Sequence, residues 1–130
     1  MATIKSFTSL EQSRKLAKIL SLKSADMIWV LANPDLPMIK AISYEDSEKS
    51  KYYEVLPAWS LAALLSVIPQ EIFNGEYIIN ITEGCDNKWI LTYDHHENRN
   101  HSYYSLSIGA DNLVDACCEM IIKLNELNLL

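Results

Sequence analysis

The sequence predicts an α+β protein with an antiparallel sheet and about three helices packed on one face of it. Three observations predict this class. Three segments carry helix start signals and apolar residues at helical spacing. A hairpin of two short apolar segments separates the first two helices, and a three-strand meander separates the last two. Turn residues join the strands in both places.

The first helix is expected from Ser9 to about Leu20. Either Thr8 with Glu11 or Ser9 with Gln12 forms a capping box at its start. One side of this helix carries apolar residues at helical spacing, namely Leu10, Leu16, Ala17 and Leu20.

The N-terminal hairpin follows. Residues 27–32 are a short, continuous apolar run with β-branched and aromatic members, which predicts a buried strand. Prolines make 33–37 a turn, and 38–44 is expected to return beside the first strand. Residues 45–54 are polar without periodicity, which predicts a mobile surface loop.

The second helix is expected from Ala58 to about Ile68, with Pro57 at its first position and Pro69 ending it. It is apolar nearly all round. A short helix without a polar face is either fully buried or partly covered by another chain.

The meander is expected at 76–83, 88–93 and 103–108, with a hairpin loop at 84–87 and Gly109 closing the sheet. Asp111 or Asn112 caps the last helix. Its apolar stripe consists of Leu113, Cys117, Met120, Leu124 and Leu127.

Composition favours one domain over residues 1–130, large enough for a core without metal or disulfides. The net charge of −6 disfavours nucleic acid and anionic membranes as partners. No apolar run is long enough to span a bilayer, and no secretion signal begins the sequence. The odd cysteine count, with Cys117 beside Cys118, predicts free thiols in the cytoplasm. We expect Cys117 to be buried, Cys118 to be more exposed and Cys85 to be the most reachable.

The sequence lacks the patterns of known catalytic and nucleotide sites. Its three glycines are too far apart for a phosphate-binding loop, and no nucleophile elbow or zinc-protease motif is present. We therefore assign no catalytic residue, no cofactor and no nucleotide.

Two polar clusters remain as candidate sites. His95, His96 and His101 lie among carboxylates in residues 94–101 and are candidate ligands for a divalent metal, although an exposed hairpin loop explains them as well. A basic patch on the first helix could contact nucleic acid, but a solvated helix face with a Glu11–Lys15 pair is the favoured interpretation. That patch consists of Arg14, Lys15 and Lys18.

Three segments together carry a resemblance: Phe7–Ser13, Pro57–Leu65 and Ala110–Met120. The chain resembles a family of small proteins from gut anaerobic bacteria and their integrated phages. The resemblance covers nearly the whole chain, and the strand region and the loop at 45–54 are less similar. That family has no assigned activity, so the resemblance implies only an accessory protein of a mobile element.

These observations favour a non-enzymatic interaction module in the cytoplasm, with a protein partner or a second copy of the chain. Tyr52 and Tyr53 in the polar loop and Trp59 on the apolar helix are the candidate contact residues. A metal-binding protein or enzyme using residues 94–101 is one alternative. A nucleic-acid accessory factor using the first helix is the other.

Overall fold

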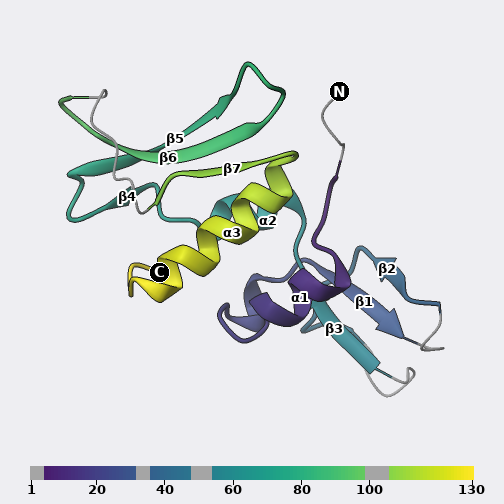
Figure 1. Ribbon diagram of the computed structural model, residues 1–130. Coiled ribbons are helices and arrows are strands. Elements are labelled where there is room, and N and C mark those ends of the chain that lie inside the picture. The colour runs from purple at the N-terminus through teal and green to yellow at the C-terminus, as the bar shows by residue number, and fades with distance from the viewer. Residues whose placement is uncertain (1–4, 32–35, 48–53, 99–105) are drawn as a thin grey trace. The chain divides into compact units, whose positions relative to one another are not determined.

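The computed structural model describes residues 5–31, 36–47, 54–98 and 106–130, and it confirms the α+β class (Figure 1). The chain divides into two compact units, which are described separately. The N-terminal unit contains residues 6–64, and the C-terminal unit contains residues 1–5 and 65–130. The expected single domain over 1–130 remains a prediction.

The N-terminal unit contains a three-stranded antiparallel sheet with the order β2-β1-β3. Its elements are the helix α1 (Leu10–Leu16), a 3₁₀ turn (Leu22–Ser24), β1 (Met27–Leu31), β2 (Met38–Lys40) and β3 (Glu54–Ala58). The predicted hairpin is confirmed, because β1 pairs with β2. The second strand ends at Lys40 instead of Tyr44. The segment expected as a loop over 45–54 contributes its last residue to β3, and 48–53 lie outside the described residues.

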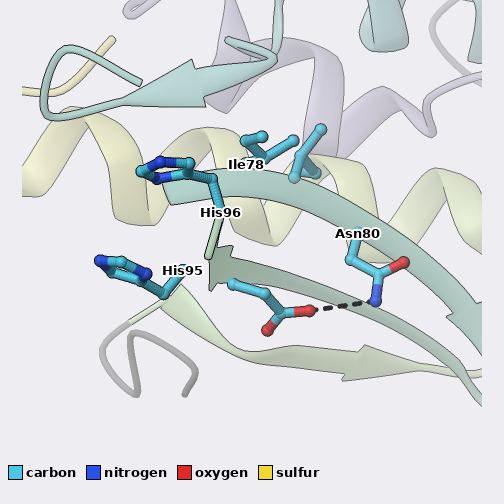
Figure 2. A pocket seen from close by; sticks show the side chains of 6 residues that line it. Ile78, Asn80, His95 and His96 are labelled. Carbon is cyan, nitrogen blue, oxygen red and sulfur yellow. Dashed lines mark hydrogen bonds between the residues drawn. The ribbon is translucent and has the colours of Figure 1, made fainter. Parts of the chain in front are cut away.

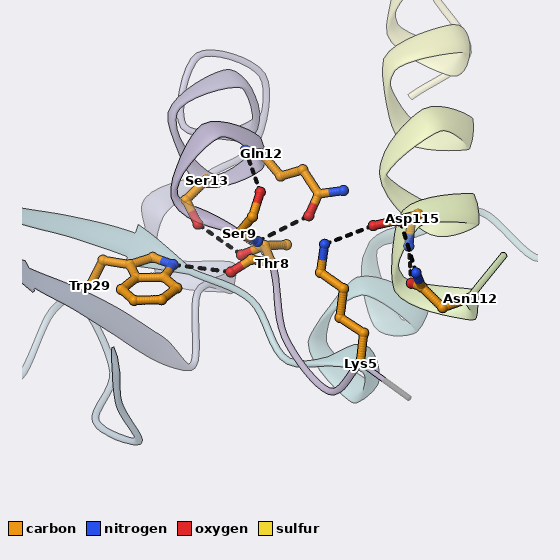
Figure 3. A network of polar contacts seen from close by, with 8 residues as sticks. All are labelled: Lys5, Thr8, Ser9, Gln12, Ser13, Trp29, Asn112 and Asp115. Atoms are coloured by element: carbon orange, nitrogen blue, oxygen red, sulfur yellow. Dashed lines mark hydrogen bonds and ion pairs between the residues drawn. The ribbon is translucent and has the colours of Figure 1, made fainter. Parts of the chain in front are cut away.

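Local hydrogen bonds fix both ends of α1. Ser9 caps it in a reciprocal box with Gln12, which confirms the second of the two predicted boxes (Figure 3). The helix ends at Leu16, four residues earlier than predicted. The backbone N–H of Ile19 donates to the Leu16 carbonyl, so the last turn tightens into i→i+3 bonds.

The start of the second helix was predicted wrongly. Pro57 lies in β3 opposite Ile28, and α2 spans Leu61–Val67. A proline has a backbone angle that suits an edge strand as well as a first helical turn, and pairing with β1 decides between them. The Ser60 hydroxyl then accepts from the backbone N–H of Ala63 at 3.2 Å, so it satisfies a donor of the first turn.

The C-terminal unit contains a four-stranded antiparallel sheet with the order β4-β5-β6-β7. Its strands are β4 (Glu71–Ile72), β5 (Tyr77–Glu83), β6 (Trp89–His95) and β7 (Ile108–Ala110), and the helix α3 spans Leu113–Glu126. The order of the predicted meander is confirmed by β5, β6 and β7, whereas β4 was not predicted. The third strand spans Ile108–Ala110, so Leu106 and Ser107, which were expected within it, precede it. Gly109 lies within β7 instead of closing the sheet, and residues 103–105 lie outside the described part of the chain.

Helix α3 packs against β6 and β7 and covers one face of this sheet. The fully buried side chains of Leu91 and Tyr93 lie on that face, and those of Val114 and Ile121 come from the helix. Asn112 caps the helix by accepting from the Asp115 backbone N–H at 2.9 Å, which decides between the two predicted caps. The Lys5 ammonium group lies 2.8 Å from the Asp115 carboxylate (Figure 3).

In the ranges that the structure describes, no helix combines the length and apolar composition that crossing a membrane requires.

Candidate functional site

A small hollow of about 170 Å³ lies in the C-terminal unit. Leu65 near the end of α2 and Ile68 just after it form one wall, Ile79 and Ile81 of β5 form the other, and Gln70 completes the lining. Leu65 and Ile81 are each 37% exposed, which is high for aliphatic side chains with so much apolar surface around them. We call these five residues the apolar hollow.

The backbone of β5 beside the hollow faces outward at alternate residues. The Ile79 N–H donates to the Gln70 carbonyl at 2.9 Å, on the side away from β6. Successive residues of an antiparallel strand direct their N–H and C=O groups to opposite sides. The N–H and C=O groups of Ile81 and Glu83 therefore point away from β6 as well. We call the side of β5 that faces away from β6 between Ile81 and Glu83 the open edge.

Two further hydrogen bonds confirm this alternation. The backbone N–H of Gly84 donates to the Lys88 carbonyl, and that of His96 donates to the Glu76 carbonyl. Both bonds join even-numbered residues at the two ends of β5 to the β6 side. The one-to-one register between β5 and β6 runs from Tyr77 to Glu83, so the odd residues keep their outward direction throughout.

The neighbouring strand β4 covers only the first part of β5 and does not extend along the open edge. Its ladder with β5 covers Glu71 and Ile72, and one more bond follows at Gln70. The residue before it, Pro69, directs its carbonyl away from β5 by the same alternation, and that carbonyl accepts from the Tyr93 hydroxyl at 2.6 Å. The chain thus leaves the sheet at Pro69, and among the described residues no strand pairs with β5 beyond Gln70.

The C-terminal unit carries the whole net charge of −6 of the protein. It contains ten Asp and Glu residues against four Lys and Arg residues, whereas the N-terminal unit contains seven of each. Glu83 of the open edge is exposed. Its side chain shares a face of the sheet with Ile79 and Ile81, because side chains alternate with a period of two.

The predicted metal ligands lie elsewhere in this unit. His95 belongs to β6 instead of a loop, and His96 follows it; their rings stack with centroids 5.2 Å apart (Figure 2). The Nδ1 atom of His95 accepts from the backbone N–H groups of Glu97 and Asn98, both at 3.3 Å. In the neutral ring this places the proton on Nε2, which lies 3.8 Å from the Glu76 carboxylate.

This arrangement does not complete a metal site in the described part of the chain, where no three His, Cys, Asp or Glu side chains form a group able to hold an ion. His101 lies outside the described residues. A more open depression of about 300 Å³ adjoins His95, and its other lining residues are Glu76, Tyr77 and Asn98. On the opposite face of the sheet, the Asn80 amide donates to Asp94, which is only 9% exposed (Figure 2).

The predicted basic patch is largely neutralised within the N-terminal unit. Arg14 forms an ion pair with Glu54 at 3.0 Å, and Lys15 pairs with Glu11 at 3.4 Å. Lys18 is exposed. The Glu11–Lys15 pair is the contact that the solvated-face interpretation expects, and it leaves less positive charge for a phosphate backbone.

The predicted contact residues differ in their outcomes. Trp59 is fully buried, so its assignment to a contact surface is wrong. Its ring N–H donates to the Ser24 hydroxyl at 2.9 Å, and its backbone N–H donates to the Thr8 hydroxyl at 3.1 Å. These bonds satisfy the ring N–H and the backbone N–H of a core residue. Tyr52 and Tyr53 lie outside the described residues.

The three cysteines are free. Cys85 is exposed and Cys117 is buried, as predicted. Cys118 is also buried, with 2% of its surface exposed, so the prediction of a more exposed thiol is wrong. Burial raises the pKa of both Cys117 and Cys118 to about 12. Such thiols stay protonated near neutral pH and are poor nucleophiles.

Sequence reasoning missed the open edge because it missed β4. The signal was present: Asn74-Gly75 is a dipeptide typical of hairpin turns, and it lies between Glu71–Ile72 and β5. Asn74 and Gly75 both have positive φ, as such a turn requires. A hairpin whose first strand is only two residues long leaves the far half of its second strand without a partner on the side away from β6, among the described residues.

Comparison of the chain with protein-family models, curated proteins and solved structures gives no match. The functional argument therefore depends on the geometry of the chain itself.

Proposed function

We propose that the chain is a non-enzymatic protein-interaction module that binds an extended segment of a partner along the open edge of β5. One observation carries the proposal: the outward N–H and C=O groups of Ile81 and Glu83 lie beside the apolar hollow. In strand addition, the backbone supplies affinity and a side-chain pocket supplies selectivity.

The composition of the edge supports this function. Sheet proteins usually protect their edges with lysines, prolines, bulges or very short strands. The part of β5 beyond Ile79, Asn80 to Glu83, contains no lysine or proline, and its pairing with β6 shows no bulge. Its one protecting charge is Glu83, and an edge with a single carboxylate and an exposed isoleucine suits a surface that is covered in use.

The size and lining of the hollow favour a side chain over a small ligand. Pockets for small molecules usually have volumes of roughly 300–1,000 Å³ and contain converging polar groups. The apolar hollow measures about 170 Å³, and none of its five lining side chains is titratable. It therefore suits one aliphatic side chain from a partner, and it offers no acid, base or nucleophile for catalysis.

The setting that we propose is an accessory role in the cytoplasm, encoded on a mobile element of a gut anaerobe or phage. Three free thiols, two of them buried, are compatible with a reducing compartment. Self-association through the same edge is the competing form of the interaction hypothesis.

A pair of matched variants tests the proposal. Ile81→Lys places a charge beside the hollow and protects the open edge, whereas Ile78→Lys places the same charge on the opposite face of the same strand. The two isoleucines are 37% and 38% exposed, so they match in burial as well as in chemistry. Extended peptides selected from a random library on the native chain should bind Ile81→Lys at least tenfold more weakly and Ile78→Lys with unchanged affinity. Equal effects of the two variants would contradict the proposal.

A divalent-metal protein is the second candidate function. The observation that favours it is the distance of 3.8 Å between His95 Nε2 and the Glu76 carboxylate, beside the stacked ring of His96. Titration of the metal-free chain with Zn²⁺ tests it by calorimetry. Binding that disappears in the triple variant His95→Ala, His96→Ala, His101→Ala would support a metal site, and an unchanged titration would exclude these ligands.

A further inference from the structure

We infer that the segment bound at the open edge runs antiparallel to β5 and carries a Lys or Arg two positions before an aliphatic residue. This inference depends on the proposed function and specifies the chemistry of the partner. It follows from the direction of the sheet, the face on which each side chain lies and the charge of the C-terminal unit.

The direction follows from β4. An incoming strand occupies the same row as β4, next to Gln70, and β4 itself is antiparallel to β5. Every strand pair in this sheet is antiparallel, and antiparallel pairing is slightly more stable per residue than parallel pairing. The C-terminal end of the bound segment therefore lies near Gln70, and its N-terminal end lies near Gly84.

The face follows from the register. Residues directly opposite each other in an antiparallel pair place their side chains on the same face. The residue opposite Ile81 thus directs its side chain to the face of the apolar hollow, which is lined by Leu65 and Ile68 beside Ile79. An aliphatic side chain at this position buries the exposed surfaces of Leu65 and Ile81.

The basic residue follows from Glu83. The residue opposite Glu83 comes two positions earlier in an antiparallel partner, and it shares the face of the glutamate side chain. Opposite charges stabilise such a cross-strand pair, and like charges destabilise it. The C-terminal unit contains ten acidic and four basic residues, and the resulting negative electrostatic potential attracts a cationic segment.

The same reasoning disfavours a second copy as the partner. Because Gln70 already occupies the position opposite Ile79, two β5 edges can pair only between residues 81 and 83. The antiparallel register that remains places Ile81 of each copy opposite Glu83 of the other. Neither carboxylate then meets a cation, and two acidic units are brought together.

The experiment uses the full chain and synthetic ten-residue peptides with blocked ends, in which a Lys-Thr-Leu step is embedded in a Thr/Ser background. A matched peptide carries Glu-Thr-Leu, and a second control carries Lys-Thr-Asp. At an ionic strength of about 50 mM, we expect the Lys-Thr-Leu peptide to bind about fivefold more tightly than the Glu-Thr-Leu peptide, since one exposed charge pair contributes modestly. It should bind at least about tenfold more tightly than the Lys-Thr-Asp peptide, which lacks the aliphatic side chain for the apolar hollow. Binding is followed by fluorescence anisotropy.

Charge reversal in the chain provides the decisive arm. Glu83→Lys should invert the preference between the Lys and Glu peptides, while Glu119→Lys, an exposed position on α3 with the same change of net charge, should preserve it.

Equal affinities of the native chain for the Lys-Thr-Leu and Glu-Thr-Leu peptides would overturn the inferred partner chemistry and leave strand addition standing. If no peptide binds and the Ile81 and Glu83 amide resonances do not change, both the inferred partner chemistry and the proposed strand addition are overturned. A dimer in native mass spectra that Ile81→Lys dissociates would assign the edge to a second copy and overturn the inference.

Discussion

The Tyr93 hydroxyl donates a hydrogen bond of 2.6 Å to the carbonyl oxygen of Pro69. The bond joins a fully buried residue in the middle of β6 to the residue at which the chain leaves the β4 row. The Pro69 carbonyl neighbours Gln70, whose own carbonyl faces β5, so it points away from β5 and is free to accept from Tyr93. The bond ties the residue next to the open edge to a side chain on the covered face of the sheet.

Tyr93→Phe tests the energetic importance of this bond. The variant keeps the ring and leaves the Pro69 carbonyl without its donor, so we expect the free energy of unfolding to fall by about 1–2 kcal/mol. Urea denaturation followed by circular dichroism measures the change. An unchanged midpoint would show that water replaces the hydroxyl at no cost.

Asn112→Ala should reduce stability by about 1 kcal/mol, because it removes the side-chain oxygen that accepts from the Asp115 backbone N–H. Asn112→Ser is the matched control, since serine caps helices nearly as well as asparagine. Thermal denaturation of the two variants should separate them by a few degrees. Equal melting temperatures would mean that the Lys5–Asp115 pair and the packing of α3 hold the helix start without the cap.

Gly75→Ala should destabilise the β4–β5 turn by roughly 1–2 kcal/mol. Gly75 has a φ of +85°, and an added Cβ would lie 3.3 Å from the Glu71 carboxylate. Gly109→Ala in the same sheet is the control, because no atom lies within 4 Å of its added Cβ and its backbone is that of a strand. Chemical denaturation should show a loss for the first variant only, and equal losses would argue against conformational strain at Gly75.

Stability should decline at alkaline pH through the two buried thiols. Their pKa values are raised from 9.0 to about 12 in the folded chain, so the unfolded chain loses their protons first. The contribution is complete below about pH 9 and decreases as the pH rises from there toward about 12, with a limiting slope near 1.4 kcal/mol per pH unit for each thiol.

Urea denaturation at a series of pH values measures this decline. Cys118→Ala should flatten the dependence between pH 9 and 12, whereas Cys85→Ser, which replaces the exposed thiol, serves as the control. Identical slopes in the native chain and in Cys118→Ala would contradict a role for the buried thiol.

Local signals predicted the fold where they were sufficient. Ser9 with Gln12 and Asn112 with Asp115 are helix starts whose hydrogen bonds join residues three positions apart. Such local bonds can be predicted from the sequence alone. The alternation of β5 and β6 is equally local, and it predicted both strands; which face is buried, the one with Leu91 and Tyr93, follows from the packing of α3.

The errors arise where contacts distant in sequence decide the structure. Pro57 suits a helix start and an edge strand equally well by backbone angle, and only pairing with β1 places it in β3. Trp59 belongs to an apolar segment expected to be a helix, but hydrogen bonds to Thr8 and Ser24 hold it in the core. The candidate site was missed because it consists of backbone groups that have no strand partner among the described residues, and no residue type encodes such groups directly. Their position depends on β4 being only two residues long, and the one local signal for that strand is the Asn74-Gly75 turn.

Amide hydrogen exchange of β5 in the free chain tests the central claim most directly. The Ile79 amide donates to Gln70, and the amides of Asn80 and Thr82 face β6, so these three should exchange slowly. The account predicts fast exchange at Ile81 and Glu83, and protection of these two on addition of the Lys-Thr-Leu peptide. Slow exchange at Ile81 and Glu83 in the chain alone would show that the edge is already paired and would contradict the account.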